Sequence, residues 1–151
     1  MIMDITQFID EASILIDFKS KSKKNVLENI SHEMSNGNIK DKDLIFEKLY
    51  EREKLGTTAF GNGIAIPHAR IPNLKEPKIL IIQLATPINF EAIDGEKVDL
   101  IISLIVPDEK NDLHIKLLAK ISELLENKAF RLEVREAKNS KDILSIMESF
   151  K

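Results

Sequence analysis

The chain alternates between segments whose apolar residues recur at helical spacing and short runs that are apolar almost throughout. The two longest runs, Lys78 to Ala85 and Val98 to Val106, are rich in isoleucine and are bounded by prolines. Such runs are typical of β-strands that are buried on both faces. Ser13 to Phe18 and the segment 64–66 predict two shorter strands. The pattern therefore predicts a sheet with both of its faces covered.

Four segments predict helices, because their apolar residues fall three or four positions apart. The first begins after Ser22, a residue type that caps helix N-termini, and ends at the Asn-Gly-Asn segment 36–38. The other three run from Asp41 or Asp43 to about Leu55, from Asp112 onward and from Ser140 onward. Helices on both sides of buried strands predict an α/β fold with layered packing, while the order of the strands stays open.

Composition favours one domain and excludes several classes of function. The 151 residues show no repeat, low-complexity segment or Pro/Gly-rich linker, so we expect a single domain over residues 1–151. The formal net charge of -3 lacks the basic excess of a non-specific nucleic-acid binder, so no nucleic-acid partner is expected. The absence of cysteine excludes disulfides, thiolate nucleophiles and cysteine-based zinc sites. No apolar run reaches the roughly 18 residues of a membrane span, and the N-terminus is not a secretory signal. We therefore expect a soluble, cytoplasmic protein.

Three of the five glycines lie in the segment GTTAFGNGIAIPHAR, residues 56–70. Two interpretations remain open: a tight loop between a helix and a strand, or a loop that presents amides and hydroxyls to an anion. The residues that would contact the anion are Thr57, Thr58, Gly61, Asn62 and Gly63. The spacing of the first two glycines superficially resembles a P-loop, but Asn62 and Gly63 stand where Lys and Ser or Thr are needed. We therefore exclude nucleotide binding by that route.

His68 follows Pro67 at the end of the short apolar run 64–66. Proline fixes its own φ at about −65° and favours an extended residue before it, so the backbone leading into His68 is stiff. A neutral imidazole is nucleophilic near pH 7 and is a good phosphoryl acceptor. A structural or surface histidine remains the alternative for a single residue of this type.

Two further residues have chemistry that suits a phosphate group. His114 is expected in the first turn of the helix from Asp112, where the dipole and free N–H groups attract phosphate and lower the pKa of an imidazole. Arg52, near the end of the second helix, carries a guanidinium that can hold two phosphate oxygens at once. The alternatives are that His114 merely flanks the core and that Arg52 pairs with a glutamate on its own helix.

A long motif from Arg52 to Arg70, REKLGTTAFGNGIAIPHAR, resembles the enzyme IIA domain of the bacterial phosphoenolpyruvate-dependent sugar phosphotransferase system, fructose/mannitol type. The resemblance extends over almost the whole chain. The segment from Gln83 to Pro107 is more similar to the nitrogen-regulatory branch of that family, and a chain without a fused permease, enzyme IIB or phosphocarrier domain also fits that branch. Two departures do not remove a functional group: Ala69-Arg70 stand where the family often has Gly-Lys, and Phe60 stands where Ile or Val is common.

The resemblance implies a fold, a reaction and a phosphate donor. The fold is a mixed, mainly parallel sheet flanked by helices on both sides, in agreement with the hydrophobic pattern. The reaction is the carriage of a phosphoryl group on Nε2 of His68, with Arg52 and His114 in the active site and with no cofactor or metal. The donor is a histidine phosphocarrier protein, which is charged by an enzyme I that uses phosphoenolpyruvate. The chain would thus be a phosphotransferase component.

The branch of the family decides what becomes of the phosphoryl group. In the nitrogen-regulatory branch the chain acts on regulatory target proteins. The alternative is a sugar-specific enzyme IIA that passes the phosphoryl group to a separate enzyme IIB during sugar uptake. Outside these branches, a binding module without phosphotransfer is disfavoured by the presence of Arg52, His68 and His114. A metal-dependent hydrolase that uses the two histidines is disfavoured because no carboxylate cluster accompanies them.

A phosphoryl group on His68 would require particular neighbours. A backbone carbonyl or another acceptor should hold Nδ1–H and leave Nε2 free. Arg52 and the loop amides at 61–63 should receive phosphoryl oxygens, and His114 should bind the group through one ring nitrogen. A partly apolar rim should surround the site for docking proteins. The candidates for that rim are Phe60, Ile64, Ile71 and Pro72.

Overall fold

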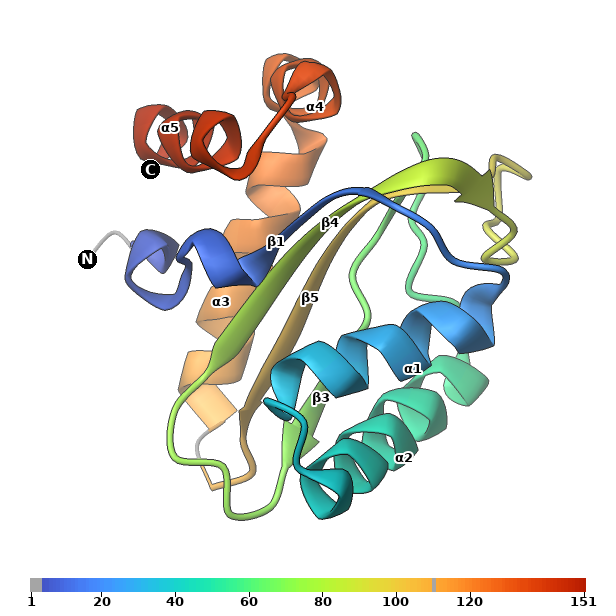
Figure 1. Cartoon of the computed structure of the whole chain (residues 1–151), viewed down its shortest axis with the longest axis vertical. Coiled ribbons are helices and arrows are strands. Elements are labelled where there is room, and N and C mark those ends of the chain that lie inside the picture. The colour runs from blue at the N-terminus through green and yellow to red at the C-terminus, as the bar shows by residue number, and fades with distance from the viewer. Residues whose placement is uncertain (1–3, 110) are drawn as a thin grey trace.

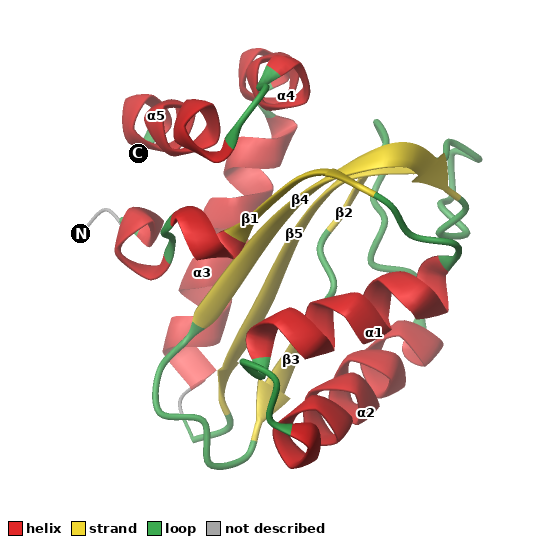
Figure 2. Ribbon diagram, in the orientation of Figure 1, coloured by secondary structure: helices red, strands yellow, loops and turns green. Residues whose placement is uncertain are grey.

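The computed structural model describes residues 4–109 and 111–151, and it places one sheet between two groups of helices (Figures 1 and 2). Two short 3-10 helices, Ile5–Phe8 and Glu11–Ser13, precede the first strand. The strands are β1 (Ile14–Phe18), β2 (Ile64–Ala65), β3 (His68–Ile71), β4 (Lys78–Ile88) and β5 (Val98–Pro107). The helices are α1 (Lys23–Met34), α2 (Ile39–Leu55), α3 (Asn111–Glu126), α4 (Lys128–Glu136) and α5 (Ser140–Phe150).

The sheet has the order β1-β4-β5-β2, and β3 also pairs with β5. The long strands β4 and β5 form an antiparallel pair at its centre. β1 is parallel to β4, and both β2 and β3 are parallel to β5. Three of the four pairings are therefore parallel, which confirms the mixed, mainly parallel sheet that the family resemblance implies. β2 and β3 form one edge of the sheet, interrupted at Ile66-Pro67.

Alternate residues of the central strands point to opposite faces, and helices cover each face. Ile81 and Leu104 belong to the apolar cluster that includes side chains of α3, α4 and α5. Ile82 and Ile105 belong to the other cluster, which includes side chains of α1 and α2. Figure 1 shows α1 and α2 on one side of the sheet and α3 to α5 on the other. The predicted sheet with both faces covered is confirmed.

The helix boundaries follow the capping residues. Ser22 caps α1, as its position in the sequence predicts. The second helix starts at Ile39 rather than at Asp41 or Asp43, because the Asn38 side chain caps it. The last helix starts at Ser140, as predicted. Within the described ranges, no helix combines the length and the apolar character that a membrane crossing requires.

The hydrophobic pattern does not predict two of the elements. Helix α4 has nine residues, of which only Phe130 and Val134 are buried, and none of the four predicted helices covers it. Strand β3 contains His68 and the exposed Arg70, and it pairs with β5 alone. An edge strand of this kind lacks the continuous apolar run of a central strand. His68 therefore begins an edge strand that the apolar pattern does not predict.

Candidate functional site

His68 is the first residue of β3, and the centre of the sheet fixes its backbone. The carbonyl of Pro67 accepts hydrogen bonds from Leu104 N–H at 3.0 Å and from the buried Ser103 hydroxyl at 2.7 Å. His68 itself lies in parallel register with Leu104 of β5. The stiffness expected from proline is thus reinforced by two hydrogen bonds from the central strand.

A backbone carbonyl selects the tautomer of His68. Its Nδ1 lies 2.7 Å from the carbonyl oxygen of Ile66. Because a carbonyl oxygen only accepts, Nδ1 carries the proton and Nε2 keeps its lone pair. Burial is the main cause that lowers the pKa of His68, and the Arg52 charge lowers it further, whereas the Ile66 hydrogen bond and Glu53 act in the opposite direction. The ring is therefore neutral near pH 7, with Nε2 as its nucleophilic nitrogen.

His114 on α3 packs its ring against that of His68. The two ring centroids are 5.5 Å apart, and the ring planes are 88° to each other. Arg70 donates a hydrogen bond from Nε to Nδ1 of His114 at 3.1 Å. Burial, followed by the charges of His68 and Arg70, lowers the pKa of His114 to about 4. The lowered pKa agrees with the sequence prediction, and burial and the two basic neighbours account for it.

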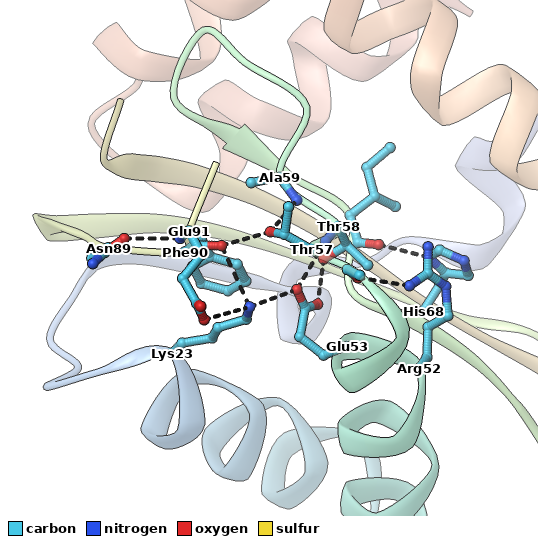
Figure 3. A network of polar contacts seen from close by, with 12 residues as sticks. Lys23, Arg52, Glu53, Thr57, Thr58, Ala59, His68, Asn89, Phe90 and Glu91 are labelled. Carbon is cyan, nitrogen blue, oxygen red and sulfur yellow. Dashed lines mark hydrogen bonds and ion pairs between the residues drawn. The ribbon is translucent and has the colours of Figure 1, made fainter. Parts of the chain in front are cut away.

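Arg52 lies beside His68 at the end of α2 (Figure 3). Its Nη1 donates a hydrogen bond to the Gly56 carbonyl oxygen at 2.8 Å, which holds the guanidinium at the helix terminus. The neighbouring glutamates on this helix have other partners: Glu51 pairs with Lys48, and Glu53 pairs with Lys23. The alternative in which Arg52 is neutralised by one of these two glutamates does not match the geometry.

A surface pocket joins these side chains. Its lining includes both histidines together with Arg52, Arg70 and Leu55. Lys48 and Lys54 also line it, and Glu51 is the one acidic residue in this lining. Four cations against one carboxylate give the pocket a positive potential, which favours an anionic group at Nε2 of His68.

The two threonines of the glycine-rich segment turn their hydroxyls to partners within the protein. Thr57 Oγ1 donates to the Phe90 carbonyl oxygen at 2.6 Å. Thr58 donates to the carboxylate of Glu53 twice, from its hydroxyl at 2.6 Å and from its backbone N–H at 2.8 Å (Figure 3). Neither threonine lines the pocket around His68. Both therefore shape the loop, which was one of the two interpretations that the sequence leaves open.

The structure does not bring residues 61–63 to His68. Gly63 lies opposite the start of β5, because its carbonyl accepts from Asp99 and Leu100 N–H groups, whereas His68 is in register with Leu104. Leu100 and Leu104 are four positions apart along β5, which corresponds to about 13 Å. The N–H of Asn62 donates to Asp94 Oδ2 at 3.1 Å. These residues form a tight structural loop, and we assign them no contact with the phosphoryl group.

The sequence pattern misses the role of Glu53. This carboxylate is 6% exposed, accepts both hydrogen bonds from Thr58 and pairs with Lys23 Nζ at 2.9 Å. It therefore ties α1, α2 and the segment before β2 together next to Arg52. In the sequence, Glu53 stands as one of several glutamates on a charged helix, and only its burial distinguishes it. No signal in the hydrophobic pattern identifies it.

The apolar rim differs from the expected one. Ile64 and Ile71 are wrong as rim residues, because both are buried in the apolar clusters of the sheet. Strand residues that face a covered side of a sheet are unavailable to partners. Phe60 is 41% exposed but does not line the pocket around His68, where the exposed apolar side chain is Leu55, at 85%.

Within residues 4–109 and 111–151, no group of three or more His, Cys, Asp or Glu side chains has the arrangement of a metal site.

Comparisons with known proteins place the chain among phosphotransferase components. The family model described as "Phosphoenolpyruvate-dependent sugar phosphotransferase system, EIIA 2" matches residues 7–150. A nitrogen regulatory protein from Bradyrhizobium diazoefficiens is 36% identical over 145 residues, which cover 96% of this chain and 95% of that protein. The crystal structure of nitrogen regulatory protein IIA-Ntr from Neisseria meningitidis superposes with a TM-score of 0.88 at 30% identity, covering 95% of this chain and 98% of that chain. The structure of IIA mannitol from Escherichia coli, at 17% identity, shares the fold with a TM-score of 0.75, covering 92% of this chain and 98% of that chain.

Proposed function

The chain belongs to the EIIA 2 family of the phosphoenolpyruvate-dependent sugar phosphotransferase system, and from this premise we propose that it carries a phosphoryl group on Nε2 of His68. One observation carries the proposal. The 2.7 Å contact between Nδ1 of His68 and the Ile66 carbonyl leaves Nε2 as the nucleophilic nitrogen. Arg52 and His114 lie next to the same ring, in a pocket with an excess of positive charge.

In the proposed step, the lone pair of His68 Nε2 attacks the phosphorus of a phosphohistidine on a histidine phosphocarrier protein. A new N–P bond forms on His68 while the N–P bond of the donor breaks, and the electron pair of that bond returns to the donor's imidazole. The transition state is loose, so positioning and positive charge provide most of the catalysis. Arg52 would bind phosphoryl oxygens through the guanidinium N–H groups that do not hold Gly56. His114 would donate a hydrogen bond to a third oxygen.

We further propose a regulatory use of the phosphoryl group, in the cytoplasm, rather than a use in sugar uptake. Support comes from the relatives that are named nitrogen regulatory proteins and that align over nearly the whole chain. In this proposal, phosphorylation of His68 changes the affinity of the chain for a regulatory target protein. A phosphoryl group adds nearly two negative charges, which would cancel part of the positive field of the pocket.

Incubation with phosphoenolpyruvate, enzyme I and a histidine phosphocarrier protein tests the acceptor residue. The parent chain should become an acid-labile phosphoprotein, and His68→Ala should not be labelled. His32→Ala is the matched control, because His32 is an exposed histidine on α1 and should leave labelling unchanged. Undiminished labelling of His68→Ala would refute the assignment.

Two assays on the phosphorylated chain separate the regulatory use from the sugar-specific alternative. In the first, the labelled chain is mixed with purified fructose- and mannitol-type enzyme IIB domains. In the second, phosphorylated and unphosphorylated forms are compared in pull-downs from the cell that produces the chain. The regulatory proposal expects no transfer to enzyme IIB and a partner that distinguishes the two forms. Rapid transfer to an enzyme IIB would favour sugar uptake instead.

A further inference from the structure

Arg70 shares a strand and a face with the proposed phosphoryl acceptor. It lies two positions after His68 in β3, so the two side chains point to the same side of the strand. The residues between and after them, Ala69 and Ile71, point the other way and are buried. The register of β3 with β5 fixes this arrangement, because His68 pairs with Leu104 and Arg70 with Val106.

The contact between Arg70 and His114 determines where the proton of His114 lies. Arg70 Nε is 3.1 Å from Nδ1 of His114. A guanidinium has only donors, so this hydrogen bond requires a lone pair on Nδ1. The neutral ring of His114 must then carry its proton on Nε2. An imidazolium would place a second donor against Nε of Arg70, so the same contact also disfavours protonation of the ring.

The tautomer matters because of what His114 faces. Its ring meets the His68 ring edge-to-face at 5.5 Å, within the positive pocket. A phosphoryl group on His68 would present oxygens that only accept hydrogen bonds at neutral pH. A His114 ring with Nε2–H can donate to such an oxygen, whereas a ring in the other tautomer would turn a lone pair toward it.

Resting on the phosphoryl-carrier function proposed above, we infer that Arg70 is a positioning residue: it fixes His114 as the Nε2–H tautomer that donates to the phosphoryl group on His68. Strand β3 then supplies both the acceptor, His68, and Arg70, which aligns His114. The distance between the two histidines depends on the pairing of β3 with β5 and on the place of α3 over the sheet. The basic residue at position 70 thereby gains a defined role, which the motif alone does not give it.

The ¹⁵N NMR signals of the His114 ring test the tautomer directly, without any phosphate transfer. In the unphosphorylated parent, Nδ1 should be unprotonated and Nε2 protonated. Arg70→Met keeps the length of the side chain but removes every donor, so the His114 signals should shift toward a mixture of tautomers. Arg70→Lys supplies a donor again and should restore part of the parent signature. Lys48→Met removes a charge from the same pocket, where Lys48 pairs with Glu51, and should leave the His114 signals in place. Unchanged ring signals in Arg70→Met would overturn the inference.

Transfer kinetics test the consequence for function. We expect Arg70→Met to slow phosphorylation by the phosphocarrier on the order of tenfold. In a His114→Ala background, the same substitution should have little further effect, because Arg70 acts through His114. An equal loss in both backgrounds would contradict a positioning role and assign Arg70 a contact of its own with the phosphoryl group. If the parent chain accepts no phosphoryl group at all, the proposed function fails, while the tautomer measurement still decides the role of Arg70.

Discussion

Each side chain at the centre of the pocket is held by one directional hydrogen bond. The carbonyl of Ile66 holds Nδ1 of His68, Arg70 holds Nδ1 of His114, and the Gly56 carbonyl holds one nitrogen of Arg52. In each histidine this hydrogen bond engages one ring nitrogen and thereby determines whether the other ring nitrogen carries the proton. In the proposed function they direct a nucleophilic nitrogen, an N–H donor and a guanidinium to one pocket, which is the preorganisation that phosphoryl transfer needs.

Substitution of Arg52 should slow transfer without unfolding the chain. Arg52 is half-buried, and Arg52→Ala would lose one hydrogen bond at the end of α2, worth about 1 kcal/mol of stability. The loss of charge stabilisation in the transition state should be larger, and we expect a rate of phosphorylation on the order of a hundredfold lower. Rapid-quench measurement of labelling, together with thermal unfolding of the same samples, gives both quantities.

Arg52→Lys provides the control for this prediction. It keeps the positive charge but loses the planar fork that holds two phosphoryl oxygens, so its rate should lie between those of the parent and Arg52→Ala. If Arg52→Ala transfers as fast as the parent, Arg52 is a residue of the helix terminus and has no part in the chemistry.

At the scale of elements, residues 61–63 connect parts of the fold and do not line the pocket around His68. Arg135 on α4 donates to Asp99 Oδ1 at 2.8 Å and also to the Asn62 carbonyl oxygen. Gln83 on β4 donates to three carbonyl groups at the end of α4. The loop before β2 is therefore fixed to β5 and to α4, at the opposite end of the edge from His68.

Alanine substitutions at Gly63 and, for comparison, at Gly37 separate the cost of backbone strain from the cost of crowding at Gly63. Gly63 and Gly37 both have positive φ, +73° and +82°, so alanine at either position should cost about 1 kcal/mol of stability. A Cβ at Gly63 would also lie 2.8 Å from Arg135 Nη2 and 3.0 Å from Asp99 Oδ1, whereas a Cβ at Gly37 meets nothing within 4 Å. We expect Gly63→Ala to be more destabilising than Gly37→Ala by about 1 kcal/mol, through the hydrogen bonds of Arg135.

Urea denaturation of the two glycine variants measures this difference. Equal losses of stability would mean that Arg135 moves aside without cost. Folded Gly63→Ala should still accept the phosphoryl group at nearly the parent rate, because the loop lies at a distance from His68. A large loss of transfer in a folded variant would reinstate the loop as part of the phosphate site.

At the scale of the whole molecule, the sequence predicts what depends on local pattern and misses what depends on long-range pairing. The apolar runs of β4 and β5 identify the central strands, and Ser22 identifies the start of α1. Strand order and the edge strand β3 depend on contacts between distant segments, which periodicity does not contain. For the same reason, residue chemistry alone offers His68 and His114 as separate candidates, and the family resemblance is what implies one active site. The Arg70–His114 contact across 44 positions becomes visible only in the fold.

Lowered pKa values at both histidines make the stability of the fold depend on pH. An unfolded histidine ionises near pH 6.5, whereas His114 in the folded chain ionises at about 4. The folded pKa of His68 is also lowered, by burial and by Arg52, against the opposing effect of Glu53. Between about pH 6.5 and about pH 4, the unfolded chain binds more protons than the folded chain. The free energy of unfolding therefore decreases as the pH falls through this range. Above about pH 6.5 both histidines are neutral in the folded and the unfolded chain, so neither contributes to the pH dependence of the free energy of unfolding.

His114→Gln isolates the contribution of one ring, because glutamine stays neutral at every pH while all carboxylates remain. Urea unfolding at about pH 7.5 and about pH 5 should show a larger loss of stability in the parent than in His114→Gln. Identical losses would indicate that His114 ionises in the folded chain as easily as in the unfolded one, contrary to its burial and its contact with Arg70.

The central claim is that the whole fold directs one nitrogen, Nε2 of His68, to accept a phosphoryl group. Correlation of ³¹P with ¹⁵N by NMR, on uniformly ¹⁵N-labelled chain phosphorylated by enzyme I and phosphocarrier, measures this directly. The structure predicts that phosphorus is bonded to Nε2 of His68, while Nδ1 keeps its proton and its hydrogen bond to Ile66. Phosphorus on Nδ1 of His68, or on His114 or His32, would contradict it.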